Sequence, residues 1–282
     1  MLSMLLLLLL AQAPSEAGRE DAKTLIQRVI DEQERQQRAQ RAFAFRERTV
    51  TRHLDKRGAV SKTESETFLV TPSAGGEYRR LLARDGHLLS ATDEAKQERK
   101  LEKHIKEQLR LSEQEREQRT RDKVEARVKR YRSRLKEALE VYDFSPLADE
   151  ILDGESVRVF RFTPKPGYEG RSRSTKILAR MEGTVWIDAE RNQLAKLSLV
   201  FMRDLKFLGG VFGGVSKGTQ ATVIGAMREN LWMLDSADVA LNARFYFLKR
   251  YRRHITVAYD DYRKFHVETE EAITSRPATF ER

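Results

Sequence analysis

The clearest pattern of hydrophobic and polar positions in the chain lies between Glu182 and Arg203 (EGTVWIDAERNQLAKLSLVFMR). A β-branched and aromatic run over 185–187 precedes a polar turn over 188–193, and apolar residues then occupy every second position from Leu197 to Phe201. Period-two alternation beside a polar turn predicts an antiparallel hairpin with one buried face. The second face carries Trp186, which indicates that another part of the protein or a ligand packs there too.

Strand-like segments separated by Gly- or Pro-containing turns occur on both sides of this hairpin. They cover residues 43–54, 60–71, 77–83, 151–152, 157–163, 219–228, 231–234, 239–248 and 251–262. Residues 172–180 are interpreted as a basic loop or an edge strand. Because a parallel pair needs a crossover of about a dozen residues or more, these short connections predict an antiparallel sheet. We expect roughly nine to eleven strands.

Two segments break the strand pattern. Residues 18–41 have apolar positions at helical spacing and predict an amphipathic helix. Residues 90–142 contain no Gly or Pro and are dominated by charged side chains. Within them, Ser90-x-x-Asp93 and Ser112-x-x-Glu115 resemble capping boxes, which predicts two helices with a joint near Ser112. This segment is interpreted as a helical insertion or lid packed on the sheet.

The N-terminus has the pattern of a secretory signal. Residues 1–10 are almost entirely apolar and are followed by Ala11-Gln12-Ala13. Cleavage after Ala13 or after Ala17 fits this pattern. We expect a signal peptide over 1–17, a single domain over 18–267 with its helical insertion at about 90–142, and a flexible tail over 268–282. The protein is then periplasmic or otherwise exported.

Composition narrows the possible functions. The 282 residues include no cysteine, which excludes disulfides, thiolate nucleophiles, cysteine zinc sites and a lipid-modified N-terminal cysteine. The chain is therefore not expected to be a lipoprotein. The formal net charge is +10, which favours acidic partners.

Much of the positive charge lies in one predicted helix. Residues 119–136 hold nine basic and two acidic side chains. This segment is either a solvated face with weak ion pairs or a surface that attracts anionic lipid headgroups. The candidates for facing a membrane are Arg127, Lys129, Arg130 and Arg134. Nucleic acid is not an expected partner, because the helix lacks interleaved aromatic residues and export conflicts with it.

Several motifs together resemble the LolA/LolB-like superfamily of outer-membrane lipoprotein-sorting proteins. They are Arg80–Leu89 (RLLARDGHLL), Leu152-Asp-Gly154, Thr163-Pro-Lys-Pro-Gly167, Gly183-Thr-Val-Trp-Ile-Asp188, Ala195–Leu199 and Tyr259–Phe265 (YDDYRKF). The resemblance covers about residues 24–265 and is greatest to uncharacterised exported bacterial members. It implies an α+β fold, in which an open antiparallel half-barrel wraps around helices and its concave apolar face holds acyl chains. The charged segment over 90–142 and the basic balance depart from the family pattern.

No catalytic signature accompanies these motifs. The five histidines lack metal-binding spacing, and no G-x-S-x-G elbow occurs. The Gly209–Gly218 segment does not fit a phosphate loop. It is either a mobile glycine loop or a loop whose apolar residues contact a lipid or gate a cavity. Asp260 and Asp261 are adjacent in a predicted strand, so we expect them to point to opposite faces. The chain is predicted to be no enzyme and to need no cofactor or metal.

The apolar strand faces are the strongest candidates for a binding site. The candidate cavity residues are Phe160, Phe162, Trp186, Leu197, Leu199, Phe201 and Phe212. Ordinary core packing uses the same residue types, and the sequence does not distinguish a filled face from a hollow one. The leading hypothesis is a non-enzymatic envelope carrier that binds a lipid acyl chain or a lipoprotein anchor. The alternative is a structural or signalling module that binds a protein partner of the envelope on the same fold.

Overall fold

The computed structural model describes residues 21–74, 76–206, 213–245 and 249–264. The helices are α1 (Ala22–Gln40), α2 (Ala91–Leu109), α3 (Glu113–Val141) and α4 (Arg173–Leu178). The longer strands are β1 (Phe43–Leu54), β2 (Val60–Ser73), β3 (Gly76–Arg84), β5 (Tyr142–Pro146), β7 (Glu155–Pro164), β8 (Met181–Asp188), β9 (Gln193–Phe201), β12 (Gln220–Arg228), β13 (Leu231–Phe245) and β14 (Lys249–Lys264). The short ones are β4 (His87–Leu88), β6 (Glu150–Leu152), β10 (Leu205–Lys206) and β11 (Gly214–Val215).

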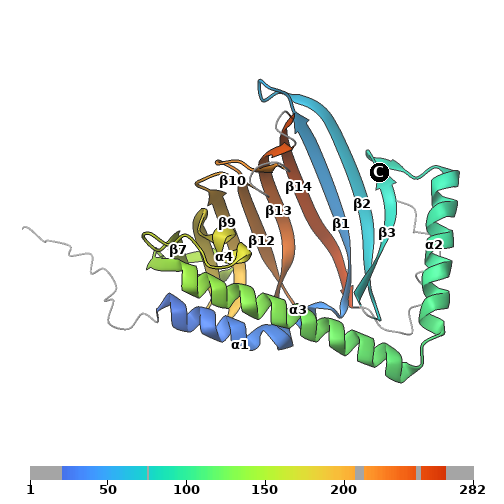
Figure 1. Cartoon of the computed structure of the whole chain (residues 1–282). Helices are drawn as coiled ribbons and strands as arrows, with labels where there is room; N and C mark the ends of the chain where they lie inside the picture. Colours follow the sequence, from blue (N-terminus) through green and yellow to red (C-terminus); the bar gives the residue numbers. More distant parts are fainter. Residues whose placement is uncertain (1–20, 75, 207–212, 246–248, 265–282) are drawn as a thin grey trace, which may run out of the picture.

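The strands form one open antiparallel sheet in the order β4-β3-β2-β1-β14-β13-β12-β9-β8-β7-β5. In the interior of the sheet the first and last strands of the described chain, β1 and β14, pair along their length. Figure 1 shows α1 and α3 side by side across one end of the strands, with the far ends of β1, β2, β13 and β14 extending beyond them. The predicted α+β half-barrel is therefore confirmed.

The main core fills the space between the helices and one face of the sheet, called the inner face from here on. α1 contributes its apolar stripe, with Leu25 and Val29 fully buried. These side chains pack against Phe160, Phe162 and Ile187 of β7 and β8. The apolar residues of α1 recur about every 3.6 positions and those of the strands every second position, so each element has one apolar face. These faces pack against each other and are buried.

A smaller cluster packs around Trp186 on the outer face of the β8–β9 hairpin, and two of its members, Ala195 and Trp232, also line the cavity described below. It contains Val157, Val159, Trp186, Ala195 and Trp232. The prediction that something packs on the second face of the 182–203 hairpin is thus confirmed, and the hairpin itself is β8–β9.

The predicted helices of the charged insertion are present. Ser90 caps α2, and Ser112 with Glu115 forms a complete capping box at the start of α3. α2 rests on the β3 edge, where His104 stacks on Tyr78 with ring centroids 4.5 Å apart. None of the helices in the described part of the chain has the length and apolar character needed to span a membrane.

Three expectations need correction. Residues 173–178 form a helix and not a loop or strand, because Ser172 and Thr175 make a capping box and the helix packs on α3 and β8. The predicted segment 231–234 and the described part of the predicted segment 239–248 belong to one strand, β13, which ends at Phe245; residues 246–248 lie outside the described residues. The described residues form 14 strands, more than the predicted nine to eleven, because four strands have only two or three residues. The predicted signal peptide and tail lie outside the described residues.

Candidate functional site

A cavity of about 520 Å³ lies between the second half of α1, the middle of α3 and the inner face of the sheet. Its walls come from α1, β1, β3, α3, β9, β12, β13 and β14. The lining residues are Gln36, Gln37, Gln40, Arg41, Phe45, Glu47, Glu77, Arg127, Tyr131, Gln193, Leu194, Ala195, Lys196, Leu197, Val223, Gly225, Trp232, Met233, Leu234, Tyr259 and Tyr262.

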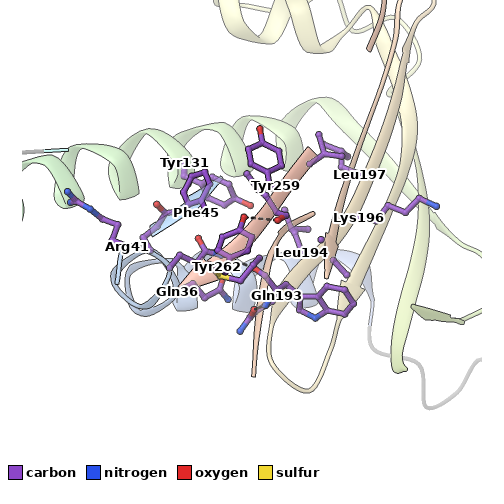
Figure 2. A pocket seen from close by; sticks show the side chains of 18 of the residues that line it. Gln36, Arg41, Phe45, Tyr131, Gln193, Leu194, Lys196, Leu197, Tyr259 and Tyr262 are labelled. Atoms are coloured by element: carbon purple, nitrogen blue, oxygen red, sulfur yellow. Dashed lines mark hydrogen bonds between the residues drawn. The ribbon is translucent and has the colours of Figure 1, made fainter. Parts of the chain in front are cut away.

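One end of the cavity is apolar. Leu194 and Leu197 of β9 lie there with Val223 of β12 and Met233 of β13. Leu197 and Val223 are directly opposite each other in the β9–β12 ladder, so they present one continuous apolar surface. Figure 2 shows Leu194 and Leu197 at the opposite end of the lining from Arg41.

Aromatic rings form the middle of the cavity. Phe45 of β1 stacks on Tyr262 at 5.2 Å and contacts Tyr259 at 6.0 Å between ring centroids. Tyr131 of α3 lies across from them in Figure 2. The Tyr262 hydroxyl donates to the carbonyl oxygen of Leu234 at 2.6 Å. Burial raises the pKa of Tyr131 and of Tyr262, so both are neutral donors at ordinary pH.

An irregularity in the β1–β14 ladder brings both β14 tyrosines to this side. The register shifts between Ala44 and Arg46, and Asp261 has a φ of 54°, in the left-handed region. Tyr259 and Tyr262 are three residues apart and would face opposite sides of a regular strand, whereas a bulge puts them on one side. The same bulge corrects the expectation for Asp260 and Asp261, because Arg46 binds both, at 2.8 and 3.4 Å.

Charged residues form the other end of the cavity. Glu47 of β1 accepts a two-point ion pair from Arg79 at 2.6 and 2.9 Å, which raises the pKa of Arg79. Glu77 of β3 accepts from both terminal nitrogens of Arg127 at 3.1 and 3.2 Å. Arg41, which caps the C-terminus of α1, donates to two backbone carbonyl oxygens on β3 and α3. Burial lowers the pKa of Arg41, and the neighbouring charge of Arg127 lowers it further.

Hydrogen bonds from α1 attach the helix to the β8–β9 and β12–β13 turns. The Gln36 amide donates to the carbonyl oxygen of Asn192 at 2.8 Å, and the Gln40 amide donates to that of Trp232 at 2.9 Å. The Gln193 side-chain oxygen accepts from the Trp232 backbone N–H at 2.8 Å. The glutamines of α1 therefore fix the end of the helix while lining the cavity.

The predicted cavity residues lie in different places. Leu197 lines the cavity. Phe160 and Phe162 are 2% and 6% exposed in the filled core below α1, and Leu199 packs against that core. Phe201 ends β9 and is half-buried. Trp186 lies on the outer face, where the Lys196 ammonium is 4.1 Å from its ring centroid. The last candidate, Phe212, lies outside the described residues.

The four predicted membrane-facing residues fall into two groups. Arg127 turns toward the cavity and pairs with Glu77. Lys129, Arg130 and Arg134 are exposed on the solvent side of α3. Arg127 therefore lines the cavity, whereas Lys129, Arg130 and Arg134 form an external basic face.

The sequence analysis did not select the aromatic middle or the charged end of the cavity. Tyr259 and Tyr262 lie within the 259–265 motif that carries the family resemblance, so that motif could have identified them as candidate site residues. Arg41 and Glu77 gave no signal, because their importance depends on α1, α3 and β3 meeting at one place.

Three of the histidines each form a hydrogen bond with one side chain. His53 bonds to Glu64 at 2.7 Å, His254 bonds to Asp238 at 2.6 Å, and His104 bonds to the Ser73 hydroxyl at 2.8 Å. Within the described ranges, no group of three or more His, Asp or Glu side chains is placed to hold a metal ion.

The comparisons with known proteins concern fold. No family model matches the chain, and no curated protein matches it. Similar solved structures include a DUF1329 family protein from Desulfovibrio piger, 11% identical over 91% of this chain and 98% of that chain, with a TM-score of 0.29. A putative outer membrane lipoprotein-sorting protein domain from Vibrio parahaemolyticus is 11% identical over 88% of this chain and 98% of that one, with a TM-score of 0.27. A chain of the Pseudomonas aeruginosa MucA/MucB complex is 11% identical over 90% and 97%, with a TM-score of 0.26.

The fold itself is established by the strand order and by the position of α1 and α3 on the inner face. The protein is thus an open antiparallel half-barrel with an amphipathic cavity between its sheet and its helices.

Proposed function

We propose that the protein is a non-enzymatic carrier of the cell envelope that shields the acyl chain of a lipid or of a lipoprotein anchor. The observation that carries this proposal is the cavity of about 520 Å³, with its apolar end on β9, β12 and β13. Its volume lies in the range of roughly 300–1,000 Å³ in which proteins bury a small ligand. The apolar start of the sequence over 1–10 supports an exported location.

Hydrophobic burial is the mechanism of binding. At about 0.8 kcal/mol for each buried CH₂ group, ten methylenes contribute about 8 kcal/mol. Association costs at least about 4 kcal/mol of lost translational and rotational freedom. The balance gives a reversible complex, which suits a protein that has to release its cargo.

The external basic face supports delivery at a membrane. Lys129, Arg130 and Arg134 are exposed on α3, the same helix that supplies Tyr131 to the cavity. Near an anionic bilayer each basic residue contributes about 1 kcal/mol of attraction. We therefore expect binding to vesicles that contain anionic lipid, weakening as salt is added.

The test is lipid uptake by delipidated protein and by one variant that fills the cavity. Val223→Phe places a larger ring at the apolar end and is expected to weaken palmitate binding about tenfold or more. Ile224→Phe is the matched control, because adjacent residues of β12 point to opposite faces of the sheet and Ile224 does not line the cavity. Native mass spectrometry and titration with palmitate measure both.

The proposal fails if the wild-type protein takes up no palmitate and an organic extract of natively purified protein contains no lipid. It fails equally if Val223→Phe and Ile224→Phe bind as the wild type does, because the ligand would then lie outside this cavity.

A second candidate function is binding of a protein partner on the uncovered part of the inner face. Val239 and Ile255 pair with each other on β13 and β14 and are half-buried, as is Val257. Alternation from Tyr259 places Ile255 and Val257 on the inner face. Both precede Tyr259 on β14, and neither lines the cavity. A protein that copurifies stoichiometrically and is released by Val257→Glu, with no lipid bound, would favour this alternative.

A further inference from the structure

The charged end of the cavity holds one more positively charged side chain than it holds negatively charged side chains. Three arginines (41, 79 and 127) and two glutamates (47 and 77) meet there. Arg79 is neutralised by Glu47, and Arg127 is neutralised by Glu77. Arg41 makes no ion pair with any residue in the part of the chain that the structure describes.

The hydrogen bonds of Arg41 are long and few. Its guanidinium donates to the carbonyl oxygen of Thr120 at 3.4 Å and to that of Gly76 at 3.2 Å. A guanidinium has five N–H donors, so most of its donor capacity is unused by these two contacts. It is partly buried and lies near the second cation, Arg127; the one carboxylate that acts on it, Glu77, is already paired with Arg127. An anion at this position would offset the cost of holding a cation out of water.

The three zones of the cavity follow one another in space. Figure 2 shows Arg41 at one end, Phe45, Tyr131 and Tyr262 in the middle, and Leu197 at the far end. A charged end, an aromatic section and an aliphatic end match a molecule with an anionic head and one hydrocarbon chain. The volume of about 520 Å³ suits one such chain and not a cluster of several.

From this arrangement we infer that the ligand is a single-chain amphiphile with an anionic head group, and that Arg41 binds the head. The inference rests on the proposed function, because it names the ligand class of the same cavity. The head is a carboxylate, as in a fatty acid, or a phosphate, as in a lysophospholipid. Arginine binds either group through two parallel N–H donors, which makes it selective for the anion and its orientation.

The experiment compares ligands that differ only at the head. Delipidated full-length protein is titrated with palmitate, with methyl palmitate and with palmitoyl lysophosphatidate, each below its aggregation concentration. The wild type is expected to prefer palmitate over the ester by about tenfold, the size of one charge-assisted contact. Arg41→Gln is expected to remove that preference, because it weakens the binding of palmitate about tenfold more than the binding of the ester. Arg121→Gln, an exposed arginine of α3 that does not line the cavity, is the matched control and should behave as the wild type does.

The possible results test the ligand class and the proposed carrier function separately. Equal binding of palmitate and methyl palmitate by the wild type overturns the inference and leaves the acyl carrier intact, and this comparison does not depend on the folding of any variant. Retention of the preference in Arg41→Gln also overturns it. Binding of none of the three probes overturns the proposed function itself. Tighter binding of lysophosphatidate than of palmitate supports a phosphate head, and the reverse order supports a carboxylate.

Discussion

Asp188 is the buried carboxylate that holds the turn of the β8–β9 hairpin, and its removal is expected to destabilise the fold. Its side chain is 1% exposed. It accepts hydrogen bonds from the backbone N–H groups of Glu190 and Arg191 at 3.0 and 2.9 Å. It also accepts from the Trp232 indole N–H and from the Arg191 guanidinium, both at 2.9 Å.

The expected loss follows from what each donor does without the carboxylate. In Asp188→Ala the Trp232 indole, 3% exposed, leaves a buried N–H unpaired, which costs about 1–3 kcal/mol. Arg191 keeps Glu155 at 2.9 Å, so its charge retains a partner. The lost turn contacts bring the expected decrease in the free energy of unfolding to about 3–5 kcal/mol. Asp188→Asn keeps one acceptor oxygen and is expected to cost about 1–2 kcal/mol.

Urea unfolding followed by tryptophan fluorescence and by circular dichroism measures these losses. Asp122→Ala, at an exposed position of α3, is the control and should stay within about 0.5 kcal/mol of the wild type. An Asp188→Ala protein within about 1 kcal/mol of the wild type would refute the reasoning. So would an Asp188→Asn protein that is less stable than Asp188→Ala, because the shared acceptor would then be irrelevant.

Three further predictions concern other elements. Gly183→Ala should cost about 2–3 kcal/mol in urea unfolding, because a Cβ there would collide with the carbonyl oxygen of Ser198, whereas Gly76→Ala, with open space around it, should be nearly neutral. Burial lowers the pKa of His104 below its ordinary 6.5, so the unfolded state binds more protons and stability should fall as pH drops through 6.5; a His104→Asn protein with the same pH slope would contradict this. Ser112→Ala should lower the melting temperature by removing about 1 kcal/mol of capping, and unchanged hydrogen exchange in the first turn of α3 would argue against it.

Most of the fold could be predicted from the sequence because local signals agreed with the tertiary structure. Period-two segments gave the long strands, and Ser112 with Glu115 gave the start of α3. The helix α4 was missed because its six residues are too few to show a period, and its stability comes from Thr175 and from packing on α3. The strand β13 was divided because Asp235, Ser236 and Asp238 interrupt the apolar pattern. The ladder with β12 nevertheless covers both segments, with a register shift at Asp235, and the ladder with β14 begins at Ser236.

The binding site was less accessible to sequence reasoning. Alternation identifies which residues share a face, and it correctly placed Leu197 and Leu199 together. It carries no information on which part of that face a helix covers. The cavity also depends on the β14 bulge, which brings Tyr259 and Tyr262 to one side, and a bulge of one residue has no reliable signature in a single sequence.

Whether the inner face is filled or hollow is decided mainly by α1. Its first half presents Leu25, Ile26, Val29 and Ile30, and beneath these residues the core is closed against β7 and β8. Its second half presents Gln36, Gln37 and Gln40 at positions where the same helical spacing would continue the apolar stripe. The amides of Gln36 and Gln40 donate to the backbone carbonyl oxygens of Asn192 and Trp232 and do not fill an apolar space, so the sheet below them keeps its cavity. The change from aliphatic to amide side chains within one helix therefore sets the boundary between the core that stabilises the protein and the space that is available to a ligand.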